Sequence, residues 1–183
     1  MEQNILRKNM WNSAAKAAIF FGLISTAYLF ITQFLGQLQI PAFLNALLGF
    51  ILWAAKFGGC VWLMMFFMKK FAEENKQADN SHVFSFGMII SFLSAIIFAA
   101  ASFADSAFIS ADMYAEQIDT AMQSYAKFMD SNSMNAIEKM MDILPQLTFF
   151  SNLIYCFLYG TVLSAILSRN IPPKNPFYGI KAE

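Results

Sequence analysis

Residues 84–104 read FSFGMIISFLSAIIFAAASFA and contain no charged side chain. A helix of about 20 residues crosses the roughly 30 Å of hydrocarbon in a bilayer. Backbone N–H and C=O groups in lipid must be hydrogen-bonded within the spanning segment. The run is therefore expected to be a membrane-spanning helix.

Three more apolar runs have membrane length, at about residues 17–38, 42–68 and 147–167. The whole chain is 58% hydrophobic and 13% charged, and its mean hydropathy is +0.50. A soluble domain is about 25% charged, so these values exclude a disordered chain and disfavour a soluble enzyme. We expect an all-α integral membrane protein, a four-helix bundle that forms a single membrane domain over residues 1–183.

The distribution of Lys and Arg predicts the orientation of the spans, because cytoplasmic segments are enriched in these residues. The segment before residue 17, the loop 69–83 and the tail after residue 168 are rich in Lys and Arg. The turn between the first two spans has none, and segment 105–146 is mainly acidic. We therefore predict cytoplasmic N- and C-termini in a multi-pass protein of the bacterial inner (cytoplasmic) membrane, with segment 105–146 outside.

The long segment 105–146 carries apolar residues at intervals of three to four, which is typical of one helical face. Tyr114, Ile118, Met122 and Tyr125 form the first such series. The pattern predicts two amphipathic helices, at about 108–130 and 134–144, interrupted at residues 130–133. Their polar faces carry few Lys or Arg, so we expect them to pack on the bundle or a partner rather than on anionic lipid.

Each span also has small residues at four-residue spacing, which lets helix backbones approach closely in a membrane. We expect these residues to pack the four helices together, although one set could instead face another membrane protein or a second copy. The candidate packing residues are Gly22, Gly58, Gly59, Gly87, Ser91, Ala95, Gly160 and Ser164.

Lys56 is the one charged residue well inside a span. A lysine at the bilayer centre costs about 2.5–3.5 kcal/mol on insertion scales, so it requires an explanation. It either faces a polar cavity, where it could meet an anion or a headgroup, or it extends to the headgroups at the outer interface. The candidate intramembrane polar site consists of Lys56, Tyr155, Tyr159, Asp105 and Gln33.

No nucleophile–base motif, phosphate loop or metal-ligand spacing is present, so we expect no enzymatic activity, no cofactor and no metal. The formal net charge is zero, which gives no basic surface for nucleic acid. The two cysteines, Cys60 and Cys156, lie in apolar runs and are expected to be reduced.

The chain resembles a family of uncharacterised four-helix membrane proteins of Bacteroidetes, catalogued as domain of unknown function 4199. The resemblance rests on Val83-Phe84-Ser85-Phe86-Gly87 at the start of the third span, and on the basic end of the fourth span with its proline-rich tail. It implies no activity and no catalytic residue. It does imply a genomic context that often includes a polyprenyl-phosphate glycosyltransferase.

Two functional hypotheses follow. The first is a non-enzymatic accessory or scaffold subunit that binds another membrane-associated protein, with a polyprenyl-phosphate glycosyltransferase as one candidate partner. The alternative is a small homo-oligomeric transporter, flippase or channel, in which a homodimer encloses a pathway and Lys56 faces it. Besides these partners, the lipid bilayer itself is the expected environment.

Overall fold

The computed structural model of the chain describes residues 2–38, 40–75, 78–125 and 131–171, and within these ranges its helices are joined by short turns without any β-strand. Four helices are long and apolar enough to cross a membrane, so the chain is a multi-pass membrane protein. The elements are α1 (Glu2–Gln37), α2 (Ala42–Glu74), α3 (Asn80–Ala104), the π-helical turn η1 (Asp105–Ile109), α4 (Ala111–Tyr125), α5 (Ser131–Asp142) and α6 (Leu144–Arg169).

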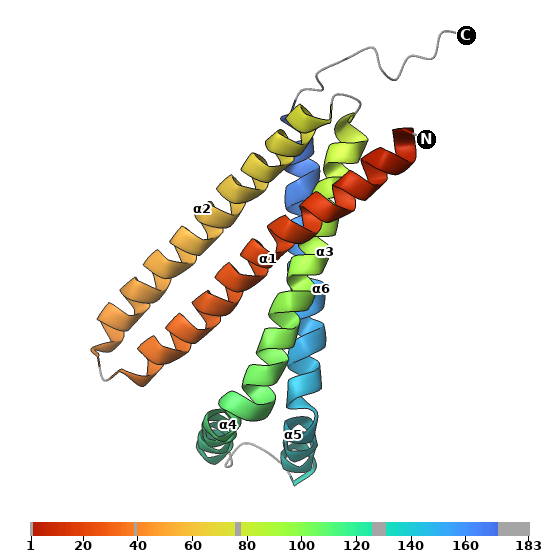
Figure 1. The fold of residues 1–183 in the computed structure, drawn as a ribbon. Coiled ribbons are helices and arrows are strands. Elements are labelled where there is room, and N and C mark those ends of the chain that lie inside the picture. Colours follow the sequence, from red (N-terminus) through yellow and green to blue (C-terminus); the bar gives the residue numbers. More distant parts are fainter. Residues whose placement is uncertain (1, 39, 76–77, 126–130, 172–183) are drawn as a thin grey trace.

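The four long helices form an arrangement that is open on one side (Figure 1). The most extensive packing is between α3 and α6, and α1 crosses α3 next. The α1–α2 hairpin diverges from the α3–α6 pair, and the separation is widest at the turn between α1 and α2. Helices α2 and α6 therefore make few contacts. This divergence leaves one side of the molecule open between α2 and α6.

The spans begin and end with local signals beyond the apolar runs. The Asp79 side chain caps α3 by accepting a hydrogen bond of 2.8 Å from the backbone N–H of His82. Pro145 lies in the first turn of α6, where its missing N–H leaves no helical hydrogen bond unmade. The helices therefore extend past the predicted limits of 17–38, 42–68, 84–104 and 147–167 into more polar sequence.

The segment between α3 and α6 differs in detail from the prediction. Residues 105–109 form the π-helical turn η1, so the first loop helix begins at Ala111 and not near residue 108. The next helix already begins at Ser131, inside the stretch predicted to interrupt the pattern. The predicted end of the first helix, with Lys127 and Met129, lies outside the described residues. Helices α4 and α5 run across the long axes of α3 and α6 (Figure 1).

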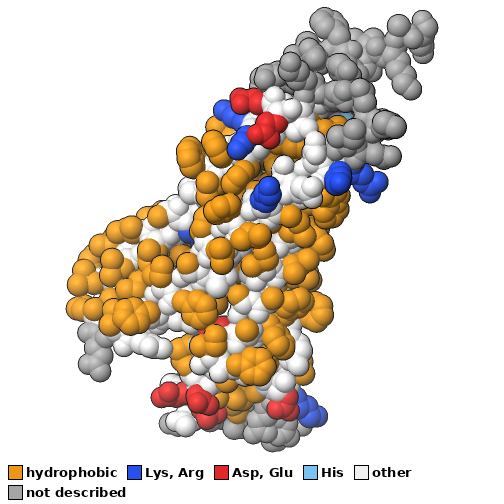
Figure 2. All heavy atoms as spheres, viewed as in Figure 1, with side chains coloured by type: hydrophobic (Ala, Val, Ile, Leu, Met, Phe, Trp, Pro, Cys, Tyr) orange, Lys and Arg blue, Asp and Glu red, His pale blue; other side chains and the backbone are white. Residues whose placement is uncertain are grey.

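The core lies toward the end of the molecule where α1 begins and α6 ends. Phe71 of α2 and Phe86 of α3 stack there with ring centroids 4.3 Å apart, and both are buried. Around the middle of the molecule the surface is apolar, and charged side chains gather at its two ends (Figure 2). This is the surface expected of a protein surrounded by acyl chains.

Candidate functional site

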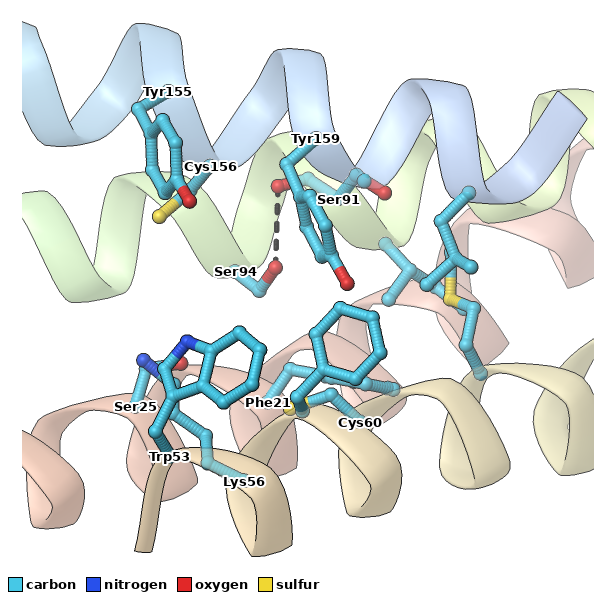
Figure 3. A pocket seen from close by; sticks show the side chains of 15 residues that line it. Phe21, Ser25, Trp53, Lys56, Cys60, Ser91, Ser94, Tyr155, Cys156 and Tyr159 are labelled. Carbon is cyan, nitrogen blue, oxygen red and sulfur yellow. Dashed lines mark hydrogen bonds between the residues drawn. The ribbon is translucent and has the colours of Figure 1, made fainter. Parts of the chain in front are cut away.

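A cavity of about 280 Å³ lies where α2 and α6 diverge, and we call it the α2–α6 cavity. Its walls come from all four long helices. Lys56 and Trp53 of α2 line one side, and Tyr155 and Tyr159 of α6 line the other (Figure 3). Trp53 and Tyr155 are 51% and 69% exposed, so the cavity opens sideways between the two helices rather than being sealed.

The Lys56 side chain extends from the cavity wall toward two aromatic rings. Its Nζ lies 4.4 Å from the ring centre of Tyr28 on α1 and 5.3 Å from that of Phe98 on α3. Cation–π contacts contribute about 0.5–2 kcal/mol, and the larger values apply to desolvated pairs. The rings therefore offset part of the cost of placing this charge inside a span.

Several donors around the cavity are uncommitted. Within the part of the chain that the structure describes, the indole N–H of Trp53 and the hydroxyls of Ser25, Tyr155 and Tyr159 have no hydrogen-bond partner, and no carboxylate pairs with Lys56. No Asp or Glu lines the cavity. The arrangement can thus bind a ligand through hydrogen-bond donors and one positive charge.

Asp105 belongs to a second site, at the end of α3. Its side chain has no exposed surface and accepts hydrogen bonds from Gln33 Nε2 at 2.6 Å, Ser110 Oγ at 2.7 Å and Tyr114 Oη at 3.1 Å. Gln33 also donates to Tyr114 Oη at 3.1 Å. Burial, together with the negative charge of Asp105, raises the pKa of Tyr114, so the phenol stays protonated as a donor. We call these four residues the Asp105 cluster.

The five residues predicted to form one polar site therefore fall into two places. Lys56, Tyr155 and Tyr159 share the α2–α6 cavity, whereas Asp105 and Gln33 lie in the Asp105 cluster. Phe98, which Lys56 faces, precedes Asp105 by seven residues, or about 10 Å of helix. Lys56 and Asp105 therefore do not pair: the carboxylate accepts three hydrogen bonds within its own cluster, and the ammonium faces two aromatic rings.

The predicted packing residues also differ in where they lie. A Cβ at Gly22 would come 2.7 Å from the Cβ of Ile97, which shows how closely α1 approaches α3. Four other members hold α3 against α6, with Gly87 opposite Ser164 and Gly160 opposite Ser91. Ala95 on α3 is buried as well.

Gly58 and Gly59 of α2, by contrast, have no atom within 4 Å of a Cβ position. With Ala54 and Ala55 they form what we call the small-residue face of α2. None of these four residues is buried. The expectation that they pack α2 onto the other spans is therefore wrong within this chain.

Sequence reasoning missed several residues of both sites. Trp53 lies three positions before Lys56 and Cys60 four after it, so helical spacing alone puts both beside the lysine. Ser110 gave no signal, and Tyr114 stood out only as part of a periodic apolar series, because the π-helical turn that brings both to Asp105 has no pattern in the sequence. Cys60 and Cys156 are both free thiols on the cavity wall, on α2 and α6 respectively.

The family model described as Protein of unknown function (DUF4199) matches residues 16–169. The chain belongs to this family. The match covers α2, α3 and α6 in full, α1 from residue 16 onward, and both sites, so the α2–α6 cavity and the Asp105 cluster are features of a DUF4199 chain. No curated protein and no solved structure matches the chain.

Proposed function

We propose that this DUF4199 chain is a non-enzymatic accessory subunit that binds a second membrane-associated protein through α2. The small-residue face of α2 carries the proposal, since Gly58 and Gly59 are the predicted packing residues for which no neighbour is found among the described residues. Helix association in lipid depends on close backbone approach, which glycine and alanine allow. Among the four long helices, α2 also has the lowest buried fraction in its most apolar stretch.

The proposed subunit lies in the bacterial inner membrane with the Lys- and Arg-rich end in the cytoplasm. Helices α4 and α5 then lie outside, along the outer leaflet. Their direction across α3 and α6 and the lack of a buried residue in α4 support this placement. A polyprenyl-phosphate glycosyltransferase stays the candidate partner that the family resemblance implies.

Native mass spectrometry of the tagged protein, extracted gently from its host membrane, tests the proposal. We expect a stoichiometric complex with a second membrane-associated protein, and Gly58→Leu should remove that protein by blocking close approach. Space around Gly58 is open, so the leucine should leave the chain itself folded.

Gly49→Leu is the matched control. Gly49 also has open space around it, but nine residues separate it from Gly58, so it faces the opposite direction on α2. The proposal fails if both variants keep the partner, or if the wild-type protein is extracted alone.

The position of Lys56 supports a second candidate function, a homo-oligomeric transporter, flippase or channel. Four helices rarely enclose a pathway, so a homodimer would have to complete it, with Lys56 facing the pathway. Lys56→Met should then abolish transport while the protein stays folded. Under the accessory function the same variant should bind its partner normally and unfold at the same or a higher temperature.

A further inference from the structure

The α2–α6 cavity has an unbalanced set of polar groups. It offers the ammonium of Lys56, the N–H of Trp53 and the hydroxyls of Tyr155 and Tyr159, yet no carboxylate lines it. In the described chain these donors have no hydrogen-bond partner. Donors next to an unpaired cation form their strongest hydrogen bonds with an anion.

The position of the cavity restricts how an anion can reach it. Phe21, Phe57 and Leu163 make much of the remaining wall apolar. The opening lies between two spans, at the exposed rings of Trp53 and Tyr155, and therefore faces acyl chains rather than water. A volume of about 280 Å³ has room for a headgroup but not for acyl chains as well. An amphiphile meets these conditions, because its chains can stay in the bilayer.

We infer that the α2–α6 cavity binds the anionic headgroup, a phosphate or a carboxylate, of a membrane lipid that enters sideways between α2 and α6. Lys56 pairs with the anion, and Tyr155 and Tyr159 donate hydrogen bonds to it. The inference rests on the cavity alone. It holds whether or not α2 docks a partner and whether or not anything is transported.

Two tryptophans on α2 make a matched pair of reporters. Trp53 lines the cavity, whereas Trp62, nine residues later, faces the opposite direction and is 64% exposed. Single-tryptophan proteins are made by changing Trp11 and one member of the pair to Phe. Each protein is placed in two kinds of phosphatidylcholine nanodisc. In one kind phosphatidylglycerol carries brominated chains, and in the other a fraction of the phosphatidylcholine carries them. Brominated chains quench the fluorescence of a nearby indole.

We expect Trp53 to be quenched preferentially by brominated phosphatidylglycerol, by about fivefold in relative binding, which is the effect of one lysine on an anionic lipid. Trp62 should report no preference. Lys56→Met should remove the preference at Trp53 and Lys56→Arg should keep it. A circular dichroism melt of each variant verifies that it is folded, and Lys56→Gln replaces Lys56→Met if the latter does not fold.

Equal quenching of Trp53 by the two lipids, or a preference that survives loss of the positive charge, overturns the inference. Inorganic phosphate added to pure phosphatidylcholine nanodiscs distinguishes the source of the anion. A Lys56-dependent change of Trp53 fluorescence with phosphate, but without lipid preference, overturns the lipid assignment in favour of a free anion. No change with phosphate, together with the lipid preference, supports it.

Discussion

Asp105 is a carboxylate without exposed surface, and its three hydrogen-bond donors come from α1, from Ser110 between η1 and α4, and from α4. Asp105 is the first residue of a π-helical turn. Such turns are frequent where a side chain has a specific role that a regular α-helix would not place correctly. The carboxylate thereby connects α4, which has no buried residue of its own, to two of the spans.

Asp105→Leu should therefore loosen α4 and destabilise the protein. Each buried donor left without a partner costs about 1–3 kcal/mol where water cannot reach it. Hydrogen–deuterium exchange in detergent should show faster exchange across α4 with little change in the middle of α3. Ser110→Ala removes one donor only, so its effect should be smaller, and unchanged α4 exchange in Asp105→Leu would contradict the role of the cluster.

Asp79 gives a pH-dependent contribution at the other end of α3. Burial acts to raise its pKa, but hydrogen bonds from the backbone and side chain of His82 outweigh this, so the pKa is lowered. A lowered pKa means that the stabilisation is present above the ordinary pKa and is lost as the pH falls through the folded-state value.

Asp79→Ala should lower the free energy of unfolding by about 1 kcal/mol near neutral pH, the usual value of an N-cap. The difference from wild type should shrink as the pH falls below the ordinary aspartate pKa of about 4 toward the lowered folded-state value. Thermal unfolding followed by circular dichroism across this range tests it. A difference that stays constant into strong acid would mean that the charge of Asp79 has no part in the cap.

The residues of both sites were only partly predictable. Helical spacing places Tyr155 and Tyr159 one turn apart, and Lys56 is recognised as a charge within an apolar run. Both predictions succeed because they depend only on position along a single helix. The separation of Lys56 from Asp105 depends instead on the angle between α2 and α3, which no local pattern encodes.

At the level of elements, α3 and α6 are joined by a reciprocal motif. Gly87 and Ser91 on α3 face Ser164 and Gly160 on the antiparallel α6, so each glycine lies opposite a serine of the other helix. Both serines donate to the carbonyl of the glycine four residues earlier on their own helix, at 2.8 Å and 2.6 Å. Their hydroxyls are thereby satisfied without a partner across the interface.

Gly87→Leu and Gly160→Leu should each separate α3 from α6. A Cβ at Gly160 would already lie 2.5 Å from the Cβ of Ser91, and overpacking of this kind costs about 1–3 kcal/mol or more. A lower unfolding temperature in detergent is the expected result. Gly36→Leu, on α1 with open space around it, is the control. If all three variants unfold together with wild type, the motif does not hold the helices.

The existence and type of the four long helices follow from apolar runs in the sequence, whereas their partners do not. The series of small residues look alike on all four spans. Which series packs against another helix depends only on how the helices cross. For α2 the crossing leaves Gly58 and Gly59 uncovered, which the sequence could not indicate.

At the scale of the whole molecule, the two ends differ in the sign of their charged side chains (Figure 2). One end carries most of the described Lys and Arg side chains, including Lys69 and Lys70 at the end of α2. The α4–α5 end is mainly acidic, including Asp112 and Glu116. The positive-inside rule predicts that the first end lies in the cytoplasm.

Cysteine labelling checks this orientation. With Cys60 and Cys156 changed to serine, Asp112→Cys should react with a membrane-impermeant maleimide in intact spheroplasts. Lys70→Cys should react only after the membrane is permeabilised. The reverse pattern would contradict the proposed orientation, and labelling of both sites in intact cells would indicate mixed topologies.

The pairing of α3 with α6 also has a consequence for biogenesis. During synthesis α3 enters the membrane well before α6, because η1, α4 and α5 lie between them in the chain. Until α6 arrives, the face of α3 that carries Ser91 lacks its main partner, so the most extensive interface forms last. A nascent chain stalled before α6 would then present this uncovered face to membrane chaperones and proteases, which gives the cell a way to recognise an incomplete copy.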